Sequence, residues 1–136
     1  MYLLDTNICI YAIKGTYACL MEKLLSIHPD HIFVSSVTVG ELEYGAAKSH
    51  WGERSRNIMR AFLASYTILP FDEKDAILLG RFRAELVALG TPIGAYDIMI
   101  AAQGFDKDFV VVTQNTREFQ SIHGLGLEDW TQLSVF

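Results

Sequence analysis

The chain has 136 residues, of which 51% are apolar, and a formal net charge of −5 at pH 7. This length is enough for one domain whose core needs no disulfide or metal staple, and the composition excludes a disordered chain. The acidic balance argues against a broad basic surface for nucleic acid, although a bound divalent cation would reverse the sign of the charge locally.

The pattern of the chain also argues against a membrane or secreted protein. No stretch approaches the roughly 18 uncharged apolar residues of a membrane span. Asp5 interrupts the apolar start, and the basic region of a signal peptide is missing. Cys9 and Cys19 lie in apolar helical contexts without a Cys-x-x-Cys motif, so we expect buried, reduced thiols in a cytoplasmic protein.

Short apolar runs typical of strands alternate with helical patterns along the chain. Strands are predicted at residues 2–4, 32–35, 67–69, 109–113 and 132–135, and helices at 7–13, 17–27, 38–49, 51–66, 72–89, 95–105 and, as a short turn, 117–119. The apolar run at 109–113 is typical of a parallel strand covered on both faces. The alternation predicts a single α/β domain over residues 1–136, with three layers (α/β/α) and a mainly parallel central sheet.

The helix at 72–89 has the clearest boundaries. Asp72 is an N-cap residue with Asp75 three positions later, and Gly90 ends the helix. Apolar residues at helical spacing predict the buried faces of two helices: Ile58, Phe62 and Leu63 in the helix at 51–66, and Ile77, Leu78, Phe82 and Leu86 in the helix at 72–89.

Three acids, Asp5, Glu41 and Asp97, each lie at or near the start of a predicted helix that follows a strand or a tight turn. Asp5 comes directly after the first strand, where open α/β sheets bind their ligands. Purely structural explanations exist for two of them. Asp5 could cap the helix that it precedes, and Thr38-x-x-Glu41 matches the capping box, in which the glutamate bonds back to the helix start.

Asp97 is harder to explain as a structural residue. Its helix is otherwise almost uncharged, and Ala101 and Gly104 follow it on the same face, so this face can pack closely on the sheet. A carboxylate held there without a partner would be costly. Three converging carboxylates would repel one another, and a hard divalent cation such as Mg²⁺ would relieve that repulsion through oxygen ligands.

Polar residues also follow the strand at 109–113. If this strand is central and parallel to the first, Thr113 and Asn115 emerge at the same edge of the sheet as Asp5. Asn115 could coordinate a metal through its carbonyl or hold a water, but it could equally lead a turn into the next helix. The four histidines offer no pair at zinc spacing.

Basic residues are concentrated in one segment, which contains Lys48, His50, Arg54, Arg56 and Arg60. A solvated helical face and an RNA-contacting arm both fit such a pattern.

Four stretches of the chain resemble PIN-domain ribonucleases, and specifically the VapC-type toxins of bacterial toxin–antitoxin pairs. They are Leu4-Asp5-Thr6-Asn7 and residues 35–42, 92–102 and 112–119, in the order and spacing of that family. The resemblance implies that Asp5, Glu41 and Asp97 bind Mg²⁺ or Mn²⁺. It gives Thr6 and Thr113 a supporting role, and it places Asn115 where many members of the family have a fourth acid.

The activity implied by the resemblance is metal-assisted hydrolysis of an RNA phosphodiester in structured RNA, with tRNA as the expected substrate. Lys48, Arg54, Arg56 and Arg60 are candidate RNA contacts. It further implies a PIN-like fold, a homodimer, and a cognate VapB-type antitoxin that covers the active site. DNA would be contacted only indirectly, through the antitoxin.

Two alternatives remain at the level of the sequence. A catalytically weakened PIN-like RNA-binding or scaffold domain would explain Asn115, but the three intact acids speak against it. A phosphatase that uses Asp5 as an aspartyl nucleophile would need a second acid two residues later, where this chain has Asn7.

Overall fold

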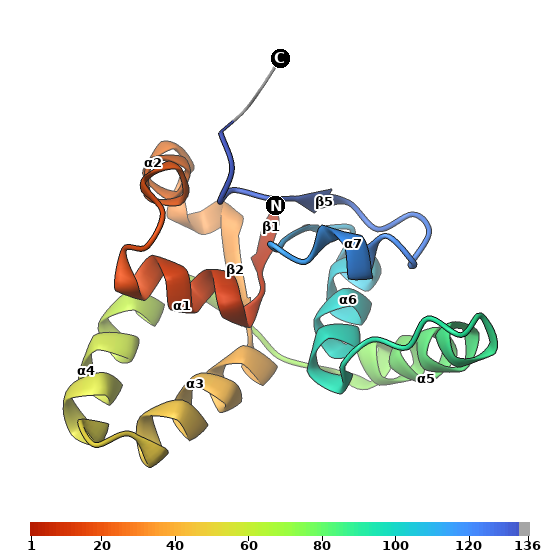
Figure 1. Ribbon diagram of the computed structural model, residues 1–136, viewed down its shortest axis with the longest axis horizontal. Helices are drawn as coiled ribbons and strands as arrows, with labels where there is room; N and C mark the ends of the chain where they lie inside the picture. Colours follow the sequence, from red (N-terminus) through yellow and green to blue (C-terminus); the bar gives the residue numbers. More distant parts are fainter. Residues whose placement is uncertain (134–136) are drawn as a thin grey trace.

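The computed structural model describes residues 1–133. Its centre is a five-stranded sheet in which every strand runs parallel to its neighbours (Figure 1). In sheet order the strands are β3 (Thr67–Leu69), β2 (Ile32–Ser35), β1 (Tyr2–Leu4), β4 (Val110–Val112) and β5 (Leu127–Glu128). Leu4 is paired with Val34 on one side and Val112 on the other. The carboxyl ends of β1, β2 and β4 therefore meet at one edge of the sheet.

Helices cover both faces of this sheet. They are α1 (Thr6–Lys14), α2 (Ala18–Ser26), α3 (Ser36–Lys48), α4 (Gly52–Leu63), α5 (Glu73–Ala88), α6 (Ala95–Lys107) and α7 (Thr116–Phe119), with a 3₁₀ turn η1 at Pro29–His31. Side chains alternate along a strand, so Leu4 packs in a core with residues of α1 to α4, whereas Leu3 packs with residues of α5 to α7. Figure 1 shows these two groups of helices on opposite sides of the sheet. The three-layer α/β prediction is confirmed, and the sheet is all-parallel.

Most element boundaries agree with the sequence prediction, but the last strand does not. β5 lies at Leu127–Glu128, where Leu127 pairs with Val111 of β4. Of the strand predicted at 132–135, residues 132 and 133 are not in a strand, and 134 and 135 lie outside the described residues. A two-residue strand is too short to produce an alternating pattern, so periodicity could not reveal it.

Two apolar residues predicted to be buried are exposed. Ile58 of α4 and Ile77 of α5 face solvent, whereas the neighbouring Met59 fills the core. Cys9 is buried as expected, but Cys19 is only partly covered. Within residues 1–133, no helix is long and apolar enough to span a membrane.

Candidate active site

Asp5 lies at the carboxyl end of β1 and caps α1. Its Oδ1 accepts a hydrogen bond of 2.9 Å from the Ile8 backbone N–H, so Asp5 does cap this helix. The side chain is almost fully buried and also accepts a hydrogen bond from Thr113. Burial raises the pKa of Asp5 to about 6, the hydrogen bonds from Thr113 and Ile8 oppose this rise, and the charges of Asp97 and Glu41 add to it. Asp5 therefore shares its site with two other carboxylates.

Glu41 does not take part in a capping box. The N-cap of α3 is Ser35, whose hydroxyl accepts a hydrogen bond from Val37, and Thr38 lies buried within the first turns of the helix. The Thr6 hydroxyl donates to Glu41 Oε1 at 2.6 Å and lies 3.0 Å from the Thr38 hydroxyl. Because Thr6 has a single proton, Thr38 donates to Thr6. The Thr6 hydroxyl thus orients Glu41, and the Thr38 hydroxyl orients Thr6.

Asp97 lies in the first turn of α6 and is half-buried. Its pKa is raised by burial, then by the negative charge of Glu118, and then by that of Glu41. Ala101 and Gly104 are both buried, as the small residues on this face predicted. The close packing of α6 on the sheet therefore brings Asp97 to the same site as Asp5 and Glu41.

Glu118 is a fourth carboxylate at this site, and the sequence interpretation missed it. It lies on the first turn of α7, three residues after Asn115. Asn115 itself is exposed at the N-cap position, its side chain caps nothing, and its backbone N–H donates to the Thr113 hydroxyl at 3.0 Å. Glu118 is one helical turn beyond Asn115, so the spacing of the two residues was the signal that could have identified it.

Asp5, Glu41 and Asp97, with Glu118 beside them, form a set of hard oxygen donors, which suits a divalent cation. The raised pKa values of Asp5 and Asp97 record the cost of burying these acids close together. A divalent ion would favour their ionised forms and offset that cost. The chemistry of the donor set therefore suits a bound metal ion, but the ligand atoms of these acids do not all lie within 4.8 Å of one another in the described residues.

Two grooves meet at Glu41. One, of about 390 Å³, lies between α1, α3 and α4 and is lined mainly by apolar residues, among them Ile10, Leu42 and Ile58. The other, of about 590 Å³, lies between α3 and α6 and contains Tyr44 and Tyr96. A polymer that crosses the acidic site therefore has open surface on both sides of Glu41.

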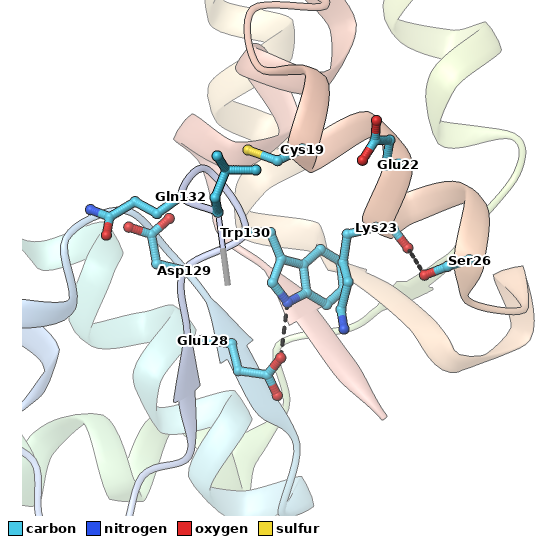
Figure 2. A pocket seen from close by; sticks show the side chains of 9 residues that line it. Cys19, Glu22, Lys23, Ser26, Glu128, Asp129, Trp130 and Gln132 are labelled. Atoms are coloured by element: carbon cyan, nitrogen blue, oxygen red, sulfur yellow. Dashed lines mark hydrogen bonds between the residues drawn. The ribbon is translucent and has the colours of Figure 1, made fainter. Parts of the chain in front are cut away.

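A third cavity, also of about 590 Å³, lies between α2 and the segment that follows β5 (Figure 2). Trp130 forms part of its wall, with its indole N–H donating to Glu128 at 3.0 Å and the Lys23 ammonium 5.8 Å from the ring centre. None of the four clustered acids lines it.

The predicted basic segment runs from the end of α3 into α4. Arg56 is neutralised by an ion pair of 2.7 Å with Glu43. Lys48 lies 5.2 Å from the ring of Tyr44, close to the second groove. Arg54 and Arg60 are exposed and make no ion pair within residues 1–133. The free positive charge of this segment therefore comes from Lys48, Arg54 and Arg60.

A separate acidic cluster joins α5 to α6. Within the described chain, Asp72, Asp75 and Asp106 are the only three acids, histidines or cysteines whose ligand atoms all lie within 4.8 Å of one another. Asp72 and Asp75 form the predicted capping box, with two hydrogen bonds of 2.9 Å. The Lys107 ammonium lies 3.1 Å from Asp72 Oδ2 and 3.2 Å from Asp106 Oδ2. Because a lysine already supplies positive charge here, we assign the cluster a structural role.

This structural cluster should make stability depend on pH. Burial raises the pKa of Asp75 to about 6, and the neighbouring Asp106 contributes to the rise. The folded state thus retains a proton that the unfolded state loses at lower pH, and stability should fall as pH rises from about 4 to about 6. The Asp75→Asn variant keeps a hydrogen-bond donor for Asp106 at every pH, so the stability of this variant should fall less than that of the wild type over the same pH range. Urea unfolding across this range measures both slopes, and equal slopes would contradict the assignment.

Comparison with known proteins finds one matching family and several similar relatives. The PIN domain family matches residues 2–125. The "tRNA(fMet)-specific endonuclease VapC" of Shigella flexneri is 40% identical over 130 residues, covering 96% of this chain and 98% of that protein. "Ribonuclease VapC2" of Haemophilus influenzae is 40% identical over 129 residues, covering 95% and 97%. A chain of the crystal structure of DNA-bound VapBC from Salmonella typhimurium superposes with a TM-score of 0.89 at 41% identity, covering 95% of this chain and 97% of that chain.

Proposed function

The chain belongs to the PIN domain family and to its VapC-type ribonucleases, and on that premise we propose that it is a metal-dependent endoribonuclease toxin that cleaves structured RNA at the Asp5 site. The observation that carries this proposal is the convergence of Asp5, Glu41 and Asp97 at the carboxyl edge of the sheet, where Glu41 raises the pKa of both Asp5 and Asp97, and Asp97 raises that of Asp5. Mg²⁺ is the ion we favour, with Mn²⁺ as its substitute, because the donors are all carboxylate oxygens.

When bound, the divalent ion supplies the chemistry that lowers the pKa of water and neutralises charge on the phosphoryl oxygens. Neighbouring residues orient the carboxylates that would bind this ion. Thr113 and the Ile8 N–H fix Asp5, and Thr6, itself held by Thr38, fixes Glu41.

Asp97 is the carboxylate we assign to orient the attacking water and accept its proton. Glu41 Oε1 already accepts the Thr6 proton at 2.6 Å, whereas burial and two neighbouring acids raise the pKa of Asp97, which makes it the better proton acceptor. In-line attack at phosphorus then leaves a 5′-phosphate and a free 3′-hydroxyl.

The substrate we propose is a structured RNA, with tRNA as the first candidate. The two S. flexneri and H. influenzae relatives are named as a tRNA(fMet)-specific endonuclease and a ribonuclease. Lys48, Arg54 and Arg60 would hold the RNA through its phosphates, and the ion pair with Glu43 gives Arg56 a smaller share.

Replacing Arg54 and Arg60 together by alanine should weaken RNA binding and flatten its salt dependence. A plot of the logarithm of the binding constant against the logarithm of salt concentration has a negative slope. Each lost phosphate contact should reduce the size of this slope by roughly 0.7 to 0.9. Binding of tRNA at a series of salt concentrations measures the slope, with Arg81→Ala on α5 as the control. An unchanged slope would show that Arg54 and Arg60 face solvent and do not contact the RNA.

We further assign the groove between α1, α3 and α4 to a VapB-type antitoxin. Its apolar wall leads directly to Glu41, so a peptide lying in it could place a basic side chain among the acids. The antitoxin would also carry the DNA contacts of the complex. A homodimer and a cytoplasmic location, where tRNA is available, complete the proposal.

The proposal is tested by RNA cleavage with purified protein. Total tRNA should be cut when Mg²⁺ or Mn²⁺ is present, and cleavage should stop in EDTA and return when the metal is added back. Cleavage that continues in EDTA would overturn the metal-dependent mechanism.

A further inference from the structure

The groove between α3 and α6, called here the tyrosine groove, carries two exposed aromatic rings beside the acidic site. It is lined by Ser36, Val37, Gly40, Glu41, Tyr44, Tyr96 and Met99. Tyr44 is 67% exposed and Tyr96 is 55% exposed, one on each helix. Large aromatic side chains left open to solvent on both walls of a groove indicate a ligand with a flat apolar face.

The charge of the tyrosine groove indicates which part of an RNA would enter it. Glu41 is the only charged residue in its lining. A phosphate would be repelled by this carboxylate, whereas an uncharged nucleobase could stack on the rings. Lys48 lies 5.2 Å from the Tyr44 ring but does not line the groove, so it is placed to meet a phosphate just outside.

The tyrosine groove is continuous with the site of cleavage. Glu41 belongs to both, and Tyr96 immediately precedes Asp97 in α6. A phosphodiester held at the acids would therefore have a neighbouring base next to Tyr44 and Tyr96.

We propose that the tyrosine groove binds a nucleobase next to the scissile phosphate by stacking it on Tyr44 and Tyr96. This inference rests on the proposed ribonuclease function and deepens it, because it adds recognition of an unpaired base to recognition of the phosphate. A base in a helical stem cannot leave its stack without cost, so the groove selects loops and other single-stranded segments of the RNA.

The test uses a set of short single-stranded RNAs that each carry one 2-aminopurine, moved through successive positions. Stacking quenches the fluorescence of this base, and Ca²⁺ replaces Mg²⁺ during the titration, so that the acids stay neutralised while the geometry that Mg²⁺ provides for cleavage is not met. With wild-type protein, one position should be quenched on binding. Tyr44→Phe and Tyr96→Phe keep the rings and should keep the quenching. Tyr44→Leu and Tyr96→Leu should lose it and bind the RNA roughly 5- to 100-fold more weakly.

An RNA with an abasic site at the quenched position provides the matching change on the other side of the contact. Wild-type protein should bind it as weakly as the leucine variants bind the intact RNA, and the leucine variants should not distinguish the two RNAs. The wild-type half of this comparison, intact against abasic RNA, does not depend on how well a variant folds.

Three results would overturn the proposal. The first is leucine variants that bind and quench like the wild type. The second is leucine variants that change only antitoxin binding or the oligomeric state, which would make the groove a protein contact. The third is wild-type protein that neither binds RNA nor cleaves it with Mg²⁺, and this result alone would also remove the proposed function.

Discussion

Asparagine in place of Asp5 is expected to abolish metal-dependent RNA cleavage, with a loss on the order of a thousandfold or more, while the protein stays folded. Asp5 both caps α1 and faces the other acids, and asparagine separates these two roles. It is as good an N-cap residue as aspartate, so the hydrogen bond to Ile8 can be retained, but it brings no negative charge to the metal.

Stability provides a second measurement on the same variant. Because burial raises the pKa of Asp5 to about 6, the folded protein bears the cost of an ionised buried carboxylate above that pH. The sign follows from linkage: stability falls as pH rises from the ordinary value of 3.8 through about 6. Asp5→Asn should therefore be at least as stable as the wild type at pH 7 in EDTA, the common result of removing a functional strain.

The comparison needs a control aspartate and a second acid of the site. Asp30 is exposed on η1, so Asp30→Asn should leave both cleavage and melting temperature unchanged. Asp97→Asn should match Asp5→Asn in lost cleavage. An Asp5→Asn protein that cleaves normally would show that Asp5 is only a helix cap. One that loses cleavage because it unfolds would show that the amide does not replace the cap.

Sequence reasoning succeeded where the signal was local. The apolar run before Asp5 and the run at 109–113 identify the two central strands, and their parallel pairing brings Asp5 and Thr113 to one edge of the sheet. A polar residue at the end of a strand is visible without knowing which strands pair. The same reasoning found the capping box of Asp72 and Asp75, whose partners are three residues apart.

The failures came from contacts between residues far apart in the chain. Thr38-x-x-Glu41 has the spacing of a capping box, but Ser35 starts the helix, and Thr6, 35 residues away, holds Glu41. Glu118 joins the site because α7 turns it towards Asp97. No local pattern distinguishes these arrangements, because the same residues would give the same periodicity if α1 or α7 packed elsewhere.

Exposed apolar residues were another source of error with a physical cause. The apolar stripe of α4 predicts that Ile58 is buried, but this residue is exposed and lines the groove that ends at Glu41. A binding surface and a core face have the same composition, so a hydrophobic pattern alone cannot tell them apart. The exposure of Ile58 in this groove supports the assignment of the groove to an antitoxin.

Gly104→Ala is expected to destabilise the protein by about 1–3 kcal/mol, the usual cost of adding a methyl group to a packed core. A Cβ at this position would lie 2.4 Å from Val111 Cγ2, far inside van der Waals contact. Val111 is a buried, β-branched residue of β4 and cannot rotate away. The steric cost should outweigh the gain in helix propensity, which is up to about 1 kcal/mol for glycine to alanine.

The same variant should also lose RNA cleavage, because Gly104 sets the distance between α6 and the sheet and α6 carries Asp97. A shift of about 1 Å at a catalytic group can cost a hundredfold in rate. Gly80→Ala on α5 is the matched control, since nothing lies within 4 Å of its Cβ position. It gains helix propensity without a clash, so its urea midpoint should rise while cleavage is unchanged. If Gly104→Ala instead behaves like Gly80→Ala, then α6 can move away from β4 without displacing Asp97, and close packing does not position this acid.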